Sequence, residues 1–62
     1  MIWLSEILLE NHEISSFEEL KKAVIRKAED GEVFLGMDVK PPYGDTPDDW
    51  EDLLEGIFTS KR

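Results

Sequence analysis

Only a few side chains of this sequence are of the types that catalyse reactions. His12 is the single histidine, and Glu10 and Glu13 lie close to it in the sequence, a combination that can orient an imidazole as a general base. A polar residue in a loop between two helices is the simpler interpretation of His12. The chain contains no cysteine, and no serine or threonine lies in the context of a nucleophile elbow, so covalent catalysis has no candidate. We therefore expect a protein that is not an enzyme and holds no cofactor.

The stretch GDTPDDWEDLLEGIF, residues 44–58, contains six carboxylates and no basic side chain. Clustered carboxylates suit hard cations, but a calcium-binding loop alternates its ligands and needs a glycine at its sixth position. Pro47 and Trp50 interrupt such an alternation here, and one histidine without cysteine cannot build a closed zinc site, so we expect no metal. The carboxylates are instead the candidate partner-binding residues of the chain: Asp45, Asp48, Asp49, Glu51, Asp52 and Glu55.

The charge of the whole chain narrows the classes of partner. Its 62 residues include 15 acidic and 7 basic side chains, which gives a formal net charge of −8. Four of the bases lie in residues 21–27. Such a chain is repelled by nucleic-acid phosphates and anionic membranes and attracted to basic protein surfaces. We therefore expect no direct nucleic-acid binding and no association with membranes.

The opening MIWLSEILLE is apolar, but it is too short to span a bilayer and carries acid where a signal peptide carries base. The absence of cysteine fits a reducing compartment. These features predict a cytoplasmic protein. The length predicts a single domain over residues 1–62, because a chain this short buries only about 60% of its unfolded surface and has no room for a second core.

The second of about three expected helices has the clearest ends. Ser16 and Glu19 form a capping box at its start, and Gly31 is well placed to end it. Apolar residues recur between them at helical spacing, which predicts an inward face. That face consists of Phe17, Leu20, Val24 and Ala28. On the outer face Glu18 and Lys22 are in the favourable i,i+4 order, so this helix mixes both signs of charge.

The third expected helix covers residues 47–58. Thr46 is suited to the N-cap and Pro47 to the first helical position. The apolar residues that follow predict one continuous buried stripe centred on Trp50. The stripe consists of Trp50, Leu53, Leu54, Ile57 and Phe58.

A strand is expected at Val33–Val39, where apolar and other residues alternate, with Val33, Leu35, Met37 and Val39 on one side. Its backbone needs a partner. The first ten residues suit either a short helix or a strand, and we favour the helix because leucine and glutamate dominate. If they form a strand, it pairs with Val33–Val39 inside the chain, and the second helix is the crossover.

If residues 1–10 are helical, the natural partner of the strand is the same strand of a second copy across a two-fold axis. A homodimer would also supply the stabilisation that a small domain without disulfide or zinc needs, and we expect one. The predicted fold class is thus α+β: a small, helix-rich single domain with one short strand that pairs with the N-terminal segment or across the dimer two-fold.

The acids of the third helix differ from those of the second in having no basic neighbours. Acid in the first helical turn stabilises the helix by opposing the positive end of its dipole, which accounts for Asp48 and Asp49 without any partner protein. Helical geometry places Asp48, Glu51, Asp52 and Glu55 on one ungapped ridge. Like charges this close destabilise a helix, and a face that serves only solubility usually mixes both signs. The ridge therefore indicates that negative charge on this helix is selected for a function.

In size, charge and lone acidic ridge the chain resembles the DNA-mimic proteins with which phages and mobile elements block host DNA-binding proteins. Such proteins share no common motif, so the resemblance covers composition and one helix. It implies an inhibitor that occupies the basic nucleic-acid-binding surface of a host nucleoid protein, polymerase, repressor or nuclease. The four bases of residues 21–27 depart from a uniformly acidic mimic.

Two other interpretations stay open. In the first, the amphipathic helix 47–58 docks into a hydrophobic groove of a partner, with Trp50, Leu53 and Ile57 as anchors and the acids steering the approach. We prefer the competing assignment of these residues to the protein's own core, because a chain this small can hardly spare five large apolar residues. In the second, the protein is a small regulatory domain without mimicry, and its acids are only a solvated face.

Overall fold

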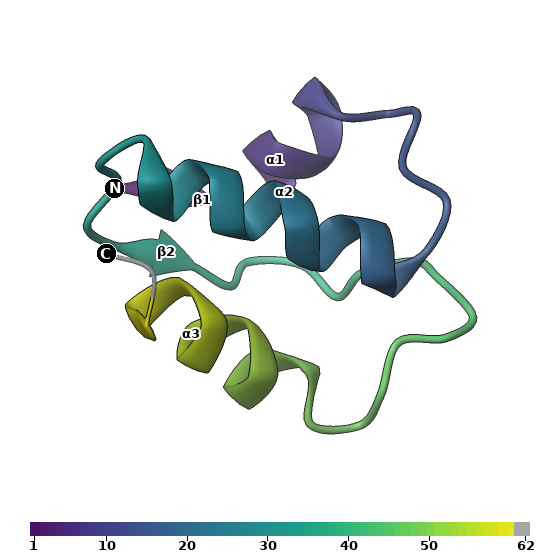
Figure 1. Cartoon of the computed structure of the whole chain (residues 1–62). Helices are drawn as coiled ribbons and strands as arrows, with labels where there is room; N and C mark the ends of the chain where they lie inside the picture. Colours follow the sequence, from purple (N-terminus) through teal and green to yellow (C-terminus); the bar gives the residue numbers. More distant parts are fainter. Residues whose placement is uncertain (61–62) are drawn as a thin grey trace.

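Helix formers between two clear caps build the centre of the molecule. The computed structural model describes residues 1–60, in the order β1 (Ile2–Trp3), α1 (Leu4–Glu10), α2 (Phe17–Glu29), β2 (Leu35–Gly36) and α3 (Trp50–Ser60). Figure 1 shows α2 across the middle of the molecule, between α1 and α3. The expected α+β, helix-rich fold is confirmed. Lys61 and Arg62, the basic end of the sequence, lie outside the described residues.

The helix α2 begins and ends where the sequence predicts, because both ends satisfy local backbone groups. Ser16 Oγ accepts a hydrogen bond from the Glu19 N–H at 3.2 Å, and Glu19 Oε1 accepts one from the Ser15 N–H at 2.8 Å. At the other end Gly31 has φ 101°, which glycine adopts without strain. The N–H groups of Gly31 and Glu32 then donate back to carbonyls of the last turn, which is a Schellman motif.

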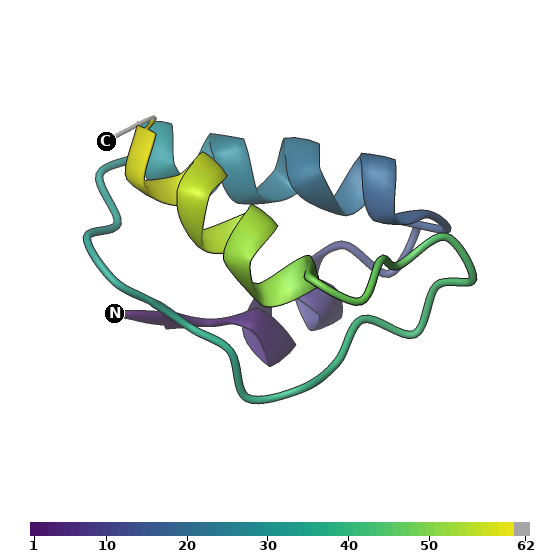
Figure 2. The ribbon, with the colours of Figure 1, turned by 90° about the horizontal axis from the view of Figure 1, so that it is seen from below.

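One apolar cluster lies between α2 and the elements packed around it. The four residues predicted as the inward face of α2 are all buried, which confirms that face. Both ends of the chain contribute, since β1, α1 and α3 each bury side chains in the same cluster. Figure 2 shows the three helices and β1 surrounding this common interior. The buried members are Ile2, Leu4, Ile7, Phe17, Leu20, Ala23, Val24, Ala28, Leu54 and Phe58.

The first ten residues contain a strand and a helix in succession. The favoured helix is confirmed from Leu4 to Glu10, while the strand alternative holds for Ile2 and Trp3. The two strands pair in parallel, with Ile2 opposite Leu35 and Trp3 opposite Gly36. The strand therefore finds its partner inside the chain. The homodimer stays a prediction, but it now rests on the small core alone and no longer on an unpaired strand.

The strand expected at Val33–Val39 is much shorter in the structure, where β2 covers only Leu35–Gly36. The partner sets this length, because β1 offers two residues before α1 begins. Leu35 and Met37 pack against the core as expected. Val33 and Val39 were expected on the same inward side, but they are 51% and 38% exposed because the chain leaves the sheet at both ends.

The helix α3 begins at Trp50 and not at Pro47, so the expected start is wrong. The Trp50 N–H donates to the Pro47 carbonyl at 3.2 Å, and this tighter turn precedes the helix. Thr46 does not act as the N-cap. Its hydroxyl donates back to the Pro41 carbonyl at 3.4 Å, and its N–H donates to the Tyr43 carbonyl, so Thr46 belongs to the preceding loop.

The buried stripe of α3 is narrower than predicted and has a different centre. Leu54 and Phe58 are buried, and Trp50 is half-buried against the core. Leu53 is 39% exposed, and Ile57 is half-buried. The stripe is therefore centred on Leu54 and Phe58, and the predicted core position of Leu53 is wrong. Helix propensity and residue spacing could not reveal this shift, because it depends on how α3 packs against α2.

The segment between β2 and α3 has no regular secondary structure, but two carboxylates fix it to helix N-termini. Asp38 Oδ1 accepts from the Ser5 N–H at 3.1 Å, and Asp38 Oδ2 accepts from the Ser5 hydroxyl at 2.6 Å, in the first turn of α1. Asp45 Oδ1 accepts from the Phe17 N–H at 2.8 Å, at the start of α2. The bonds from the Ser5 and Phe17 N–H groups satisfy donors that a helix leaves unpaired at its start. In Figure 1 the segment runs from β2 to the start of α2 and returns to α3.

The glycine at position 36 is covered by an aromatic ring. A Cβ at this position would overlap the indole of Trp3 on the neighbouring strand, whereas a Cβ at Gly56 in α3 would meet nothing. We expect Gly36→Ala to lower the free energy of unfolding by about 1–3 kcal/mol through overpacking. Gly56→Ala should raise it by about 0.5–1 kcal/mol, because alanine is the better helix former. Urea unfolding followed by tryptophan fluorescence measures both, and equal effects of the two variants would contradict the packing of Trp3 on Gly36.

Asp45 should stabilise the fold as a cap of α2. We expect Asp45→Ala to lower the free energy of unfolding by about 0.5–2 kcal/mol, which is typical for loss of a cap. Asp48→Ala is the matched control, because the Asp48 side chain is exposed and makes no hydrogen bond within residues 1–60. It should change the same quantity by less than about 0.5 kcal/mol. Chemical unfolding of both variants measures the difference. If Asp48→Ala lowers the free energy of unfolding as much as Asp45→Ala, Asp45 does not act as a cap.

The pH dependence of stability should report the bond between Asp38 and α1. The hydrogen bond from the Ser5 hydroxyl lowers the pKa of Asp38 below its ordinary value. A carboxyl with a lowered folded-state pKa stabilises the fold fully above its unfolded-state pKa of about 3.9, and this contribution disappears as pH falls through the folded-state value. Thermal melts between about pH 2 and pH 6 should therefore show a shallower loss of stability for Asp38→Asn than for Asp48→Asn. Identical pH profiles would contradict the assignment.

Candidate functional site

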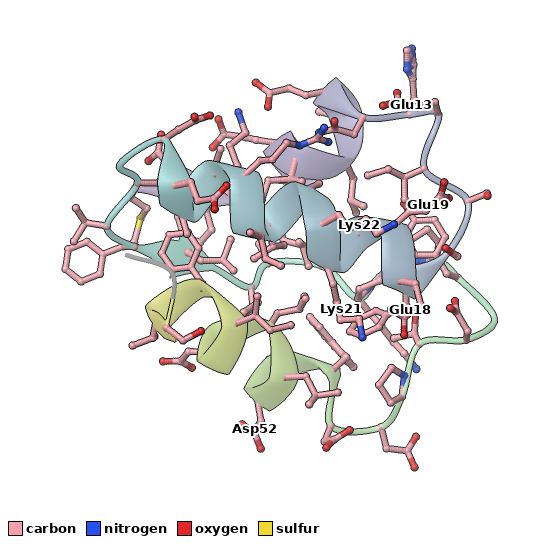
Figure 3. The ribbon with its side chains drawn as sticks, in the orientation of Figure 1. Glu13, Glu18, Glu19, Lys21, Lys22 and Asp52 are labelled. Carbon is pink, nitrogen blue, oxygen red and sulfur yellow. The ribbon has the colours of Figure 1, made fainter. Side chains whose placement is uncertain are left out.

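All six carboxylates predicted to bind a partner are exposed. Asp45, Asp48 and Asp49 precede α3, and the other three lie on the helix. Figure 3 shows Asp52 projecting away from the rest of the molecule. The expected four-residue helical ridge therefore has three members on the helix itself, because Asp48 lies in the turn before it. We call these three, Glu51, Asp52 and Glu55, the acidic flank.

The geometry of α3 separates the acidic flank from its exposed apolar residues. Measured from buried Leu54 at about 100° per residue, the acidic flank spans about 60° to 160° in one direction. Leu53 and Ile57 lie about 100° and 60° away in the opposite direction. One helix thus presents two surfaces of different chemistry, with the core residues between them.

The ion pairs of the described chain lie away from the acidic flank. Within residues 1–60 they join Lys21 to Glu18 at 2.9 Å, Lys27 to Glu10 at 2.8 Å, and the N-terminal amino group to Glu32 at 3.7 Å. No carboxylate of the acidic flank has an ionic partner within this part of the chain. The negative charge of α3 therefore faces solvent without compensation from residues 1–60.

Two of the four bases of α2 form ion pairs with neighbouring acids. Lys21 pairs with Glu18 three residues earlier, where the sequence suggested Lys22, and its Nζ lies 5.9 Å from the ring centre of Phe17. The hydrogen bond to Glu10 raises the pKa of Lys27 above its ordinary value. Lys22 lies near Glu19, whose lowered pKa comes first from the hydrogen bonds donated by Ser15. The basic patch is thus less positive than its sequence suggests.

Two of the seven acids in residues 38–55 hold the fold together, and only one of these two was predicted as a site residue. Asp45 caps α2, so the structure places it in the fold as well as on the surface. Asp38 caps α1 and was not assigned any role from the sequence. Neither duty has a sequence signal, because each carboxylate serves a helix that lies far from it along the chain.

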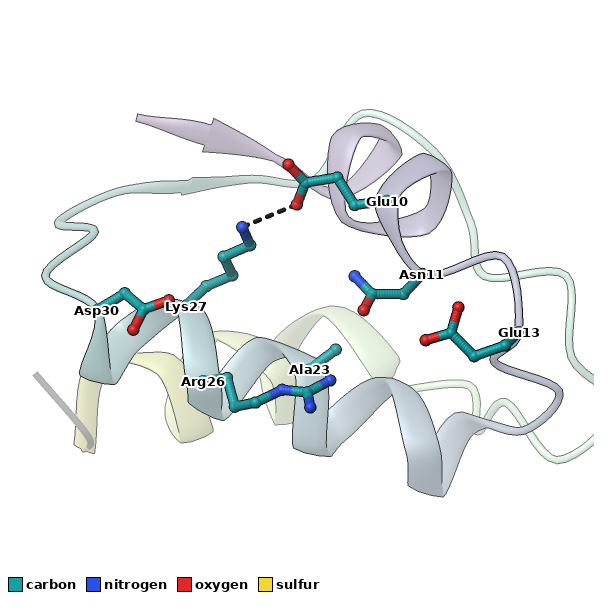
Figure 4. A pocket seen from close by; sticks show the side chains of 7 residues that line it. All are labelled: Glu10, Asn11, Glu13, Ala23, Arg26, Lys27 and Asp30. Atoms are coloured by element: carbon teal, nitrogen blue, oxygen red, sulfur yellow. Dashed lines mark ion pairs between the residues drawn. The ribbon is translucent and has the colours of Figure 1, made fainter.

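A hollow of about 230 Å³ lies between α2 and the end of α1 (Figure 4). Its rim includes the pair of Glu10 and Lys27, so this carboxylate is directed to a lysine and not to His12. His12 itself is exposed in the turn after α1. Acids and bases alternate around the hollow, which leaves no dominant sign of charge. Its lining consists of Glu10, Asn11, Glu13, Ala23, Arg26, Lys27 and Asp30.

A second hollow, of about 170 Å³, lies next to the acidic flank. Glu55 and Thr59 of α3 form one side, the residues before and within β2 form the other, and buried Phe58 lies between them. The alternation in the sequence puts Phe34 on the side of the strand opposite Leu35, but no sequence pattern predicts that residues 33–35 lie next to Glu55. The lining is Val33, Phe34, Leu35, Glu55, Phe58 and Thr59.

Neither a metal cluster nor a membrane-spanning helix is present in the described part of the chain. No group of three or more histidine, aspartate or glutamate side chains within residues 1–60 is arranged to hold a metal ion. In the same residues each helix is too short or too polar to cross a bilayer. Comparison of the chain with protein-family models, curated proteins and solved structures found no match.

Proposed function

We propose that this protein is a non-enzymatic DNA mimic that inhibits a host DNA-binding protein by occupying its basic surface. The single observation that carries the proposal is the uncompensated charge of the acidic flank, which is exposed and has no ion pair within residues 1–60. Asp48 and Asp49 extend this negative surface toward the loop. The partner class is a nucleoid protein, polymerase, repressor or nuclease, and the proposed compartment is the cytoplasm.

The spacing of the acidic flank suits the replacement of phosphates. Side chains three and four apart on a helix lie about 5 to 6 Å from one another. Successive phosphates of one DNA strand advance about 3.4 Å along the axis while they wind around it, so the two spacings are similar in scale. Lysine and arginine side chains that contact phosphates can therefore contact these carboxylates instead. A homodimer would present two such surfaces.

The arrangement of the other charges also supports the proposal. The four bases of residues 21–27 were the main departure from an acidic mimic. Two of them, Lys21 and Lys27, form ion pairs within the chain, and Lys22 lies near Glu19. A basic partner that approaches α3 therefore meets less repulsion than the sequence suggests.

Docking through the apolar side of α3 is the second candidate, and the exposure of Leu53 favours it. This leucine is 39% exposed on the side of α3 opposite the acidic flank. Ile57 is half-buried beside it, whereas Trp50 packs against the core and is less available as an anchor. In this case the acids would only steer a partner whose groove accepts Leu53 and Ile57.

Displacement of DNA from purified host proteins tests the mimic. A purified bacterial nucleoid protein, repressor, RNA polymerase and nuclease are each loaded with a fluorescent DNA duplex, and release is followed by anisotropy as this protein is added. We expect release from at least one of them, weakening steeply as salt rises. The triple variant Glu51→Gln, Asp52→Asn and Glu55→Gln should displace DNA about tenfold less well, since each lost contact is worth up to about 1 kcal/mol.

A matched variant separates the acidic flank from net charge. Glu13→Gln, Glu29→Gln and Asp30→Asn remove three exposed acids elsewhere, so both triple variants change the net charge from −8 to −5. We expect this control to displace DNA like the unchanged protein. Leu53→Ser is the third variant of this experiment. It should lower the displacement of DNA only if the protein binds its partner through the apolar side of α3. Equal behaviour of the two triple variants, or a host protein that holds this protein and DNA together, would rule out mimicry through the acidic flank.

A further inference from the structure

We propose that the hollow beside the acidic flank is a binding site for an arginine side chain of the partner protein. It is the hollow of about 170 Å³ lined by Phe34, Glu55 and their neighbours, and we call it the α3–β2 groove. The inference rests on the proposed function, because arginine is a main phosphate-contacting residue of DNA-binding proteins. It adds the place where one such side chain binds and the chemistry that selects it.

The groove combines the two groups that recognise a guanidinium ion. Glu55 supplies a carboxylate with no ion pair within residues 1–60, which can accept two parallel N–H bonds from arginine. Phe34 is 63% exposed and supplies an aromatic ring on which a planar cation can stack. Lysine has a strongly hydrated point charge and no planar face, so it fits this pair of groups less well.

The walls of the groove are held in place by the fold. The Phe34 carbonyl accepts a hydrogen bond from the Ile2 N–H at 2.9 Å, which fixes the backbone of Phe34 to β1. On the other side Glu55 follows Leu54, which is fully buried and anchors that turn of α3. Phe58 lies between the two walls and is only 3% exposed. The aromatic ring and the carboxylate are therefore presented by backbone segments that are each attached to the rest of the fold.

The electrostatic field at the groove also favours a cation. The groove lies along the second half of α3, where the helix dipole places its negative end. Asp52 and Glu51 lie on the same side of α3 and add to the field. The volume exceeds what a single water molecule needs, so a guanidinium group can enter between the walls. Apolar lining from Leu35 and Phe58 suits the methylene stem of arginine.

The first hollow does not offer this chemistry. Arg26 and the paired Lys27 stand among its acids, so an incoming arginine would meet like charge as well as opposite charge. It also lacks an aromatic side chain. The α3–β2 groove is therefore the better candidate for arginine recognition.

Titration with two peptides of equal charge tests the inference without any host protein. The acetylated, amidated peptides Gly-Arg-Gly-Arg-Gly and Gly-Lys-Gly-Lys-Gly are added to the labelled full-length protein, and backbone amide shifts are followed by NMR. We expect the arginine peptide to bind at least about threefold more tightly and to shift residues 33–35 and 55–59 most, because stacking favours the guanidinium. Equal affinity of the two peptides, or shifts centred elsewhere, would overturn the inference.

Single substitutions assign the preference to the two recognition groups. Phe34→Ala and Glu55→Gln should each reduce the arginine preference to less than about 1.5-fold, since each removes one of the two contacts. Leu9→Ala is the control, because Leu9 is 79% exposed and lies on α1, outside the groove. Retention of the full preference in Phe34→Ala would overturn the inference. Circular dichroism of each variant verifies the fold, and Phe34→Leu replaces Phe34→Ala if the latter unfolds.

The two basic residues at the end of the chain need their own control. Lys61 and Arg62 follow α3 in the sequence, so the titration is repeated with Lys61→Gln and Arg62→Gln in the full-length chain. Arginine-peptide binding that is equal or tighter in this variant supports a site for an external side chain, and loss of binding contradicts it. If the protein prefers the arginine peptide but no host protein releases DNA, arginine binding in the α3–β2 groove is supported and the proposed DNA mimicry is wrong. If DNA is released but the protein does not prefer the arginine peptide, DNA mimicry is supported and the proposed arginine site is wrong.

Discussion

The structure depends on two aspartate side chains that reach helix N-termini from a distant part of the chain. Asp38 and Asp45 belong to the segment between β2 and α3, which has no regular hydrogen-bond pattern of its own. Each carboxylate satisfies an N–H group that its helix leaves unpaired, and each opposes the positive end of a helix dipole. The segment is thereby fixed to α1 and to α2. This anchoring sets where α3 begins and hence where the acidic flank is displayed.

The same residue type therefore serves two purposes in this chain. Asp38, Asp45, Glu10 and Glu18 form hydrogen bonds or ion pairs that join elements or steady α2. Within the described residues the acids of α3 have no such partner. Net charge alone does not distinguish these groups, because both contribute equally to it. The distinction gives the proposed DNA mimicry its physical content, since only charge without an internal partner remains available to attract another protein.

Residues close together in the sequence were enough to predict the limits of α2, but they did not predict where α3 begins. Ser16, Glu19 and Gly31 lie at the ends of the helix that they define, so the sequence predicted both its limits and its buried face. The start of α3 was wrong because the Thr46 hydroxyl turns back toward Pro41, a tertiary preference that no capping pattern contains. The length of β2 was wrong because it is set by β1, more than thirty residues away. Of the candidate site, the sequence predicted the exposed acids of α3, but not the approach of Phe34 to Glu55.

The pairing of Ile2 with Leu35 has a consequence for how the chain comes to be folded. Ile2 and Trp3 must wait for residues that are made about thirty positions later, because β1 finds its only described partner in β2. Until then Ile2, Leu4 and Ile7 have no finished interior to enter, while α2 already has its capping serine and its terminating glycine. Long-range closure of this kind slows folding relative to purely local contacts. The order of synthesis and the order of assembly thus differ, and the segment that contains β1 is among the last parts to pack into the interior.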